Sequence, residues 1–312
     1  MPFTFSFSSI QFANLIAGKR LSLTADKFTP LSPDKFWSAF DDYLTLQQAL
    51  SGHPDVILET GDNQPANGVG ATIRFEYENS ITRETLIIYD PQKRIWKIKL
   101  PEANSIFSFY ELTIRVYPIS DVGEGSEVTL TLDFSVQGNN AEERAKNLQL
   151  LANLPEYQRV NEINNFILQR DGLRSSFEVD IYCPAEKLWA IIGTWEDVSW
   201  VQHSLDVRML TGGGRRIIFP QNQILEENLI YADDAEKTLV YEVTKSIMPV
   251  ILYQGTIKLY AIDSQSTNVQ YNNVYLPKEG LEPQQVKAGM DRSFKERFDW
   301  LHKQFDSRSL SS

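Results

Sequence analysis

Two stretches of this chain repeat each other, and this repeat constrains the fold more than any other feature. Leu31–Trp37 aligns without gaps on Cys183–Trp189, at an offset of 152 residues. Further along, a second offset of 143 residues relates positions of the same or similar type: Glu84/Glu227, Leu86/Leu229, Asp90/Asp233, Ile98/Tyr241, Tyr110/Tyr253, Thr113/Thr256 and Ile114/Ile257. A supersecondary pattern that recurs at a fixed distance predicts two copies of one domain, and 312 residues are enough for two cores.

Between these anchors, apolar and polar residues alternate in both halves. Alternation of this kind predicts strands of an antiparallel meander with one buried face. After Pro283, apolar residues step by three or four positions, which predicts a helix of about six turns; they are Val286, Met290, Phe294, Phe298, Leu301 and Phe305. The first half has a counterpart from about residue 141 to 170, with a possible break at Pro155.

The sequence therefore predicts an α+β chain of two tandem domains, each a curved antiparallel sheet wrapped on a long C-terminal helix. Residues 1–20 form an N-terminal arm, in which the alternation at 3–7 predicts a strand or packed segment. The first domain is expected at 21–170 and the second at 173–312, joined at Asp171-Gly172. Because His53–Gly70 carries Pro and Gly, it is expected to be a longer loop in the first copy.

Composition excludes several classes of function. The formal net charge is −11, so a polyphosphate partner would be repelled, and nucleic acid is not expected. Cys183 is the only cysteine, so no disulfide framework is predicted. The three histidines lie far apart in the sequence and do not show the spacing of metal ligands, so no metal or other cofactor is predicted. No run of about 18 apolar residues occurs, so no membrane span is expected. A cytoplasmic location is the expectation.

The order of predicted elements and several short motifs resemble the START-like superfamily, and within it polyketide cyclase/dehydrase proteins. The first copy matches at the helix opening that ends in Trp37, at the turn Gly68–Gly70, at Ile81–Leu86 and at Tyr110; the second echoes these from Pro184 to Ile257. The resemblance implies helix-grip domains that enclose a hydrophobic cavity. A resemblance to the lachrymatory-factor synthases, plant lyases of this superfamily, would in addition pair Arg74 with Glu84.

Three residues are candidates for acid-base chemistry: Glu84, Glu227 and Arg74. Both glutamates are predicted on apolar strand faces, where burial would raise the pKa of a carboxyl group. The alternative is a structural glutamate bonded to the backbone or to an arginine. Alternation places Arg74 with Thr72 and Glu76, so without a bulge its side chain is expected to point to solvent.

A further set of residues is predicted to contact a ligand, because a phenol combines an apolar body with one hydrogen bond; it comprises Tyr110, Tyr241, Tyr253, Tyr271, Asn273, Tyr275, Trp200 and His203. Packing in the core with satisfied hydroxyls is the alternative. Several phenols and an amide need partners and tend to leave a roomier pocket, so the second copy is predicted to be the better ligand site.

The leading hypothesis is binding or carriage of a small hydrophobic molecule in a helix-grip cavity. The alternative is a polyketide aromatase/cyclase- or dehydratase-like enzyme that uses a cavity carboxylate as acid or base. Bacterial enzymes of that kind resemble this chain in length and in their duplicated layout, but their characteristic pocket residues have no match here. A protein-interaction module is a third class, for which the sequence carries no specific sign.

Overall fold

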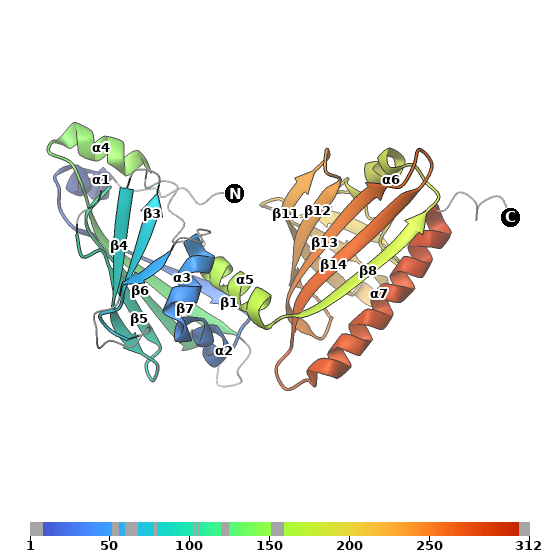
Figure 1. The fold of residues 1–312 in the computed structure, drawn as a ribbon, viewed down its shortest axis with the longest axis horizontal. Coiled ribbons are helices and arrows are strands. Elements are labelled where there is room, and N and C mark those ends of the chain that lie inside the picture. The colour runs from blue at the N-terminus through green and yellow to red at the C-terminus, as the bar shows by residue number, and fades with distance from the viewer. Residues whose placement is uncertain are drawn as a thin grey trace. The chain divides into compact units, whose positions relative to one another are not determined.

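A computed structural model describes residues 9–51, 56–59, 68–77, 80–102, 104, 106–119, 125–150 and 159–305. It divides the chain into two compact units, Pro2–Ile167 and Leu168–Ser312. Each unit contains one antiparallel sheet of seven strands (Figure 1). The predicted architecture of two antiparallel sheets with long helices is confirmed.

The first unit contains five α-helices and seven strands in its described part. The helices are α1 (Ser9–Ile16), α2 (Pro33–Trp37), α3 (Tyr43–Ser51), α4 (Ala141–Leu150) and α5 (Arg159–Asp171), which runs on into the second unit. The strands are β1 (Leu21–Thr29), β2 (Ile57–Glu59), β3 (Thr72–Tyr77), β4 (Ser80–Asp90), β5 (Ile95–Lys99), β6 (Phe107–Pro118) and β7 (Ser126–Val136). Their order across the sheet is β1-β7-β6-β5-β4-β3-β2.

The second unit repeats this plan. Its strands are β8 (Leu173–Ile181), β9 (Asp206–Met209), β10 (Arg215–Ile218), β11 (Ile224–Asp233), β12 (Thr238–Lys245), β13 (Val250–Ala261) and β14 (Thr267–Pro277). The order β8-β14-β13-β12-β11-β10-β9 is the order of the first sheet, strand for strand. Two helices complete it in the described part: α6 (Ala185–Ile192) and α7 (Pro283–Phe305), the long helix at the C-terminal end of Figure 1.

Local sequence explains where the first helix of each copy begins. The hydroxyl of Ser32 caps α2 by accepting a hydrogen bond from the Lys35 amide, at 3.3 Å, and Pro33 follows with the φ that a helix start needs. In the second copy Pro184 aligns with Ser32 at the N-cap of α6, and it provides no side-chain hydrogen bond. Both helices bury their tryptophans, Trp37 and Trp189, each 6% exposed.

The predicted apolar stripe of α7 faces the core, since Val286, Met290, Phe294, Phe298 and Leu301 are all buried. Phe294 is the centre of this contact. Its ring lies 5.4 Å from that of Phe177 on β8 and 5.3 Å from that of Tyr271 on β14. The helix therefore closes the second sheet through aromatic packing.

Four expectations from the sequence need correction or fall outside the described residues. Ser9–Ile16 within the predicted arm is a helix, and residues 3–7 lie outside the described part. The predicted loop at 53–70 contains the short strand β2. The predicted alternation is interrupted in β4 and β11, where bulges after Leu86 and Leu229 shift the register and leave Ile88 and Tyr231 exposed. The predicted break near Pro155 falls between α4 and α5, at residues that are not described.

Corresponding strand registers show which residues occupy equivalent places in the two copies. Tyr110 pairs with Phe134, and Tyr253 pairs with Tyr275. In the same ladders, five apolar residues of the first copy have polar or smaller counterparts in the second: Ile98/Tyr241, Leu112/Gly255, Leu130/Tyr271, Leu132/Asn273 and Phe134/Tyr275. The same fold therefore encloses a polar cluster only in the second copy at these positions.

Gly255 makes room for this cluster. A Cβ atom built on it would lie 2.8 Å from the ring of Tyr241, its cross-strand neighbour. The first copy has Leu112 at this place, facing the narrower Ile98. The change from Leu to Gly thus accompanies the change from Ile to Tyr, because two large side chains cannot share the space.

Candidate functional site

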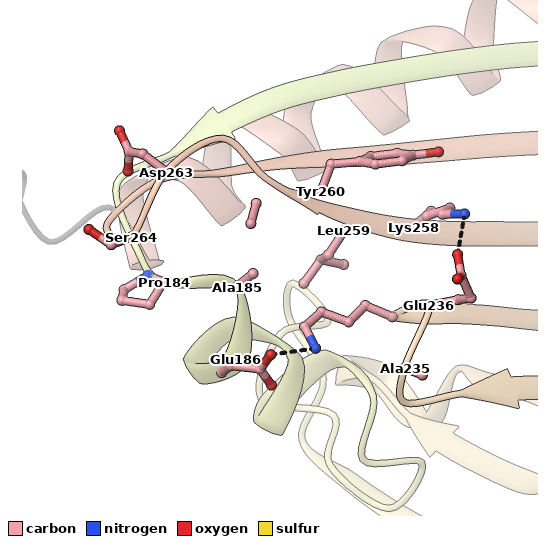
Figure 2. A pocket seen from close by; sticks show the side chains of 12 residues that line it. Pro184, Ala185, Glu186, Ala235, Glu236, Lys258, Leu259, Tyr260, Asp263 and Ser264 are labelled. Carbon is pink, nitrogen blue, oxygen red and sulfur yellow. Dashed lines mark hydrogen bonds and ion pairs between the residues drawn. The ribbon is translucent and has the colours of Figure 1, made fainter.

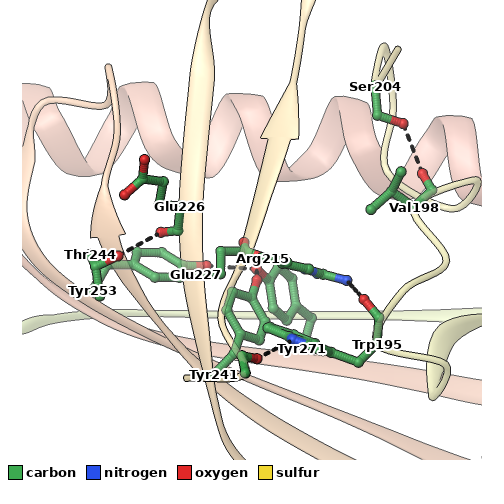
Figure 3. A network of polar contacts seen from close by, with 11 residues as sticks. Trp195, Val198, Ser204, Arg215, Glu226, Glu227, Tyr241, Thr244, Tyr253 and Tyr271 are labelled. Atoms are coloured by element: carbon green, nitrogen blue, oxygen red, sulfur yellow. Dashed lines mark hydrogen bonds and ion pairs between the residues drawn. The ribbon is translucent and has the colours of Figure 1, made fainter. Parts of the chain in front are cut away.

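A buried ion pair lies inside the second unit. Arg215 on β10 and Glu227 on β11 are direct cross-strand partners, and they are 1% and 3% exposed. The guanidinium donates a hydrogen bond from Nε to Oε2 of Glu227 at 2.8 Å, and its Nη2 lies 2.7 Å from the same oxygen. Figure 3 shows this pair between the strands. Its depth distinguishes it from Arg216–Glu226 beside it, where the arginine side chain is 39% exposed.

The rest of the Arg215 guanidinium is also held. Nη1 donates to the carbonyl oxygen of Trp195 at 2.8 Å (Figure 3), and the guanidinium carbon lies 3.8 Å from the centre of the Trp195 ring. The Trp200 ring lies 5.8 Å away. The segment after α6 is thus tied to β10 through a cation, its counter-ion and two indoles.

A chain of hydrogen-bonded phenols continues from the ion pair into the interior. Tyr241 bonds Tyr271, Tyr271 bonds Tyr253 at 2.6 Å, and Tyr253 donates to Oδ1 of Asn273. Since Tyr253 has one proton and gives it to the amide, the chain runs in one direction, from Tyr241 through Tyr271 to Tyr253. Figure 3 shows the three phenols converging. The hydroxyls that the sequence predicted would face a ligand therefore bond mainly to one another.

Burial keeps these phenols neutral. It raises the pKa of Tyr241 and of Tyr253 well above the usual value, and the neighbouring phenols add to the effect. It also raises the pKa of Tyr271, although Arg297 opposes this. At neutral pH the chain therefore offers hydrogen bonds and no basic phenolate.

A small cavity lies beside the phenol chain, between the sheet and the C-terminal half of α7. Its volume is about 20 Å³, room for about one water molecule. The surface that faces the cavity is apolar; the residues around it are Ile192, Trp200, Ile257, Val269, Tyr271, Arg297, Phe298 and Leu301. The cavity thus lies where the helix-grip plan places it, although the surrounding side chains nearly fill it.

Arg297 is the charged member of this wall. It occupies the inward stripe of α7, between Phe294 and Leu301, and it is half-buried. Burial lowers its pKa, but its interactions with Tyr271, Tyr241, Tyr253 and Glu227 outweigh burial, so the pKa is raised and the side chain is a cation. Within the described part of the chain it has neither a hydrogen bond nor an ion pair.

A larger hollow opens on the surface of the same unit, and the lysines along it are paired with carboxylates. It has a volume of about 540 Å³ and lies between the start of α6, the turn at 235–237 and the end of β13 (Figure 2). Its lysines already have counter-ions, since Lys237 lies 2.7 Å from Glu186 and Lys258 lies 3.2 Å from Glu236. We do not assign a ligand to it.

The structure separates the candidates Arg74 and Glu84. Glu84 is the cross-strand partner of Ile73, so Arg74 lies on the other face of β3. There it meets Glu76 at 2.7 Å and Glu59 at 3.5 Å. In the first copy, the position equivalent to Arg215 is Ile73. The pairing that the resemblance implies for Arg74 and Glu84 is therefore found between Arg215 and Glu227.

The remaining predicted ligand contacts fall in different places. Trp200 and Tyr271 line the cavity. Tyr275 bonds the hydroxyl of Ser175 at 3.0 Å, and Tyr110 of the first unit packs on Phe107 with ring centres 4.9 Å apart. His203 is exposed in a turn with φ of 64° and is not part of the cavity wall.

Two residues of the site, Arg215 and Arg297, were not predicted from the sequence. Strand alternation could have found Arg215, because it shares a face with the buried Ile217 and stands opposite Glu227 across the β10–β11 hairpin. Arg297 lies one residue from Phe298 in a stripe that the apolar pattern already explains. Helical spacing alone places it at the edge of that stripe and does not show that it lines a cavity.

In the part of the chain that the structure describes, no group of three His, Cys, Asp or Glu residues could hold a metal ion. Among the same residues, no helix is both long and apolar enough to cross a membrane.

Comparison with known proteins agrees with the fold. Residues 20–153 match the family model described as polyketide cyclase / dehydrase and lipid transport. No curated protein sequence matches the chain.

Three solved structures illustrate the similarity. The di-domain ARO/CYC BexL from the BE-7585A biosynthetic pathway is 10% identical over 92% of this chain and 99% of its own, with a TM-score of 0.41. The di-domain ARO/CYC StfQ from the steffimycin pathway is 11% identical over 94% and 100%, with a TM-score of 0.39. The protein XoxI from Bacillus cereus is 19% identical over 42% and 94%, with a TM-score of 0.40.

The family model thus covers most of the first unit, and the second unit repeats the strand order of the first. Residues 20–153 are similar to the polyketide cyclase / dehydrase and lipid transport family, in a chain that contains two sheets of the same topology.

Proposed function

We propose that the second domain binds a small, mainly apolar molecule between its sheet and α7. The observation that carries this proposal is the cavity there, which exposes only apolar surface. Ligand sites of proteins are lined predominantly by hydrophobic and aromatic side chains. Ile192, Ile257 and Leu301 are part of this lining.

A ligand larger than water requires the wall to move, since the cavity holds only about 20 Å³. The segment between α6 and β9, residues 193–205, carries Trp200 and contains neither an α-helix nor a strand. Its displacement would open the cavity without breaking the sheet. The free energy of opening is subtracted from the affinity, so we expect moderate binding.

An enzymatic function is the second candidate, and the ion pair next to the phenol chain is the observation that favours it. Glu227 is the buried carboxylate that an acid-base mechanism would use, and the resemblance to aromatase/cyclases points the same way. The geometry supports binding better, because Glu227 lies outside the cavity wall in a buried ion pair with Arg215 and the phenols are held neutral.

Blocking the cavity tests the proposal. Ile257 lines the wall, and its equivalent in the first copy is Ile114; the two are 3% and 2% exposed. We expect Ile257→Trp to weaken binding of the neutral fluorescent probe N-phenyl-1-naphthylamine at least tenfold, because the larger side chain fills the cavity. Ile114→Trp, the matched control, should leave the affinity within twofold.

Both variants are first checked for folding by thermal unfolding, because overpacking costs about 1–3 kcal/mol. The measurement is a fluorescence titration of the full chain. If Ile114→Trp abolished binding and Ile257→Trp did not, the first domain would be the ligand site and the proposal would be wrong.

A further inference from the structure

The indole of Trp200 lines the cavity of the second domain, and one of its own atoms is unsatisfied. The side chain is 4% exposed and borders the cavity from the segment after α6, opposite Leu301 on α7. In the described part of the chain, its Nε1 atom is buried with no hydrogen-bond partner. A buried donor without an acceptor has lost its hydrogen bond to water, so this position of the indole carries a free-energy cost.

Two other buried tryptophans of this domain have acceptors. Trp189 donates from Nε1 to Oδ1 of Asp234 at 2.9 Å. Trp195 donates from Nε1 to the carbonyl oxygen of Gly213 at 3.0 Å. Because the surface that faces the cavity is apolar, a molecule in the closed cavity does not reach the N–H of Trp200. Movement of the indole toward water would satisfy it.

The segment that carries this tryptophan, residues 193–205, is bonded to the sheet near its two ends. At one end, the carbonyl oxygen of Trp195 accepts a hydrogen bond from Nη1 of Arg215 at 2.8 Å. At the other end, the amide of Leu205 donates to the carbonyl oxygen of Ile218, also at 2.8 Å. These two points fix where the segment begins and ends on β10.

Between these points the segment bonds to itself. The Ser204 hydroxyl donates to the carbonyl oxygens of Val198 and Val201, each at 2.8 Å, and Figure 3 shows the first of these bonds. The amide of Val201 donates to the carbonyl oxygen of Val198 at 2.8 Å. Among the described residues, no hydrogen bond joins residues 196–204 to a strand. The middle of the segment can therefore leave the sheet by breaking apolar contacts and no hydrogen bond.

A purely structural role for Trp200 is the competing explanation. The indole belongs to the same buried cluster as Ile192 and Phe298, and the guanidinium carbon of Arg215 lies 5.8 Å from the centre of its ring. A tryptophan that serves only to fill the core stays in place when a ligand binds beside it. The two explanations thus differ in where the indole lies in the complex.

We propose that Trp200 is a displaceable plug of the second-domain cavity: its indole occupies the space that the ligand takes, and the segment 193–205 carries it outward on binding. This inference rests on the proposed function and adds how that site opens. The cavity of about 20 Å³ is then the closed state, and an outward indole leaves room for an apolar group of its own size. The closed state lowers the apparent affinity by the fraction of chains that are open.

The indole N–H of Trp200 reports the position of this side chain in the native, ¹⁵N-labelled full chain. We expect its hydrogen exchange with solvent to become about tenfold faster or more when N-phenyl-1-naphthylamine saturates the chain, because the N–H moves from the interior into water. The N–H of Trp189, which is bonded to Asp234, should keep its exchange rate. The Trp200 resonance is assigned by its absence in Trp200→Phe. Unchanged or slower exchange of Trp200 at saturating probe would overturn the plug while leaving ligand binding intact.

Removal of the indole provides a second test, in a variant first checked for folding by thermal unfolding. Trp200→Ala should bind the probe about tenfold more tightly or better, because no plug has to be displaced. Leu301→Ala is the matched control, since it also truncates a buried side chain of the cavity wall, and it should gain much less. Equal gains in the two variants would show that added space alone limits binding, and the plug would be wrong. If the probe bound neither the native chain nor Trp200→Ala, the proposed function itself would fail, and the inference with it.

Discussion

Glu227→Ala should lower the free energy of unfolding of the second domain by about 3–5 kcal/mol. The reason is that Arg215, 1% exposed, would keep its charge in the interior with its counter-ion gone. Its contacts with the Trp195 carbonyl and ring cannot replace a carboxylate. The measurement is the urea midpoint followed by tryptophan fluorescence, which reports on Trp189, Trp195, Trp200 and Trp300 in this domain.

The neighbouring pair supplies a matched control. Arg216 and Glu226 lie on the same two strands at 2.6 Å, but the arginine is 39% exposed, so Glu226→Ala should cost less than about 1 kcal/mol. Replacing both buried partners, as in Arg215→Met with Glu227→Leu, should recover most of the loss, since no lone charge remains. Equal costs for the two alanine variants would contradict the buried pair described above.

Alkaline pH should unfold the second domain in a cooperative transition. Tyr241, Tyr253 and Tyr271 are buried, and their pKa values are raised in the folded state. The neutral phenol is therefore the form that folding favours, and its contribution is complete below the unfolded-state pKa of about 10 and lost as the pH rises above it. Three phenols kept protonated cost about 4 kcal/mol for each pH unit above 10.

Absorbance at 295 nm, which follows phenolate, and far-ultraviolet circular dichroism would test this together. We expect one part of the 13 tyrosines to ionise reversibly and a second part to ionise only as the sheet unfolds. Tyr260→Phe, at a 43% exposed position, should leave the transition unchanged. Ionisation of all phenols before any loss of ellipticity would show that the Tyr241–Tyr271–Tyr253 chain is not buried as described.

The fold could be predicted from the sequence because its determinants are periodic. Helical spacing from Val286 to Leu301 and alternation along β6 and β13 are both consequences of one buried face. The duplicated anchors then gave the topology of both copies. Bulges interrupt this alternation locally, as after Leu229, where the register shifts and Tyr231 is exposed.

The site could be predicted only in part, because polar pairing depends on register across strands. Glu227 and the tyrosines were predicted to be inward from their own strands, but the partner of Glu227 lies on another strand. Arg74 follows Ile73 on β3, and neighbouring residues of a strand point to opposite faces of the sheet. Arg74 therefore lies on the face opposite Glu84, where it pairs with Glu76. The hydrogen bonds among the phenols and the small cavity of about 20 Å³ also depend on how the strands pack in three dimensions.

The most direct test is a titration of the full, ¹⁵N-labelled chain with N-phenyl-1-naphthylamine, observed through its six indole N–H resonances. We expect a saturable shift of the Trp200 resonance, because the Trp200 ring lines the cavity, and a smaller shift of Trp195, which donates to the Gly213 carbonyl at 3.0 Å. Trp37 and Trp96 of the first domain should not move. Shifts confined to Trp37 and Trp96, or no shift of any indole at saturating probe, would contradict the assignment of the ligand site to the second domain.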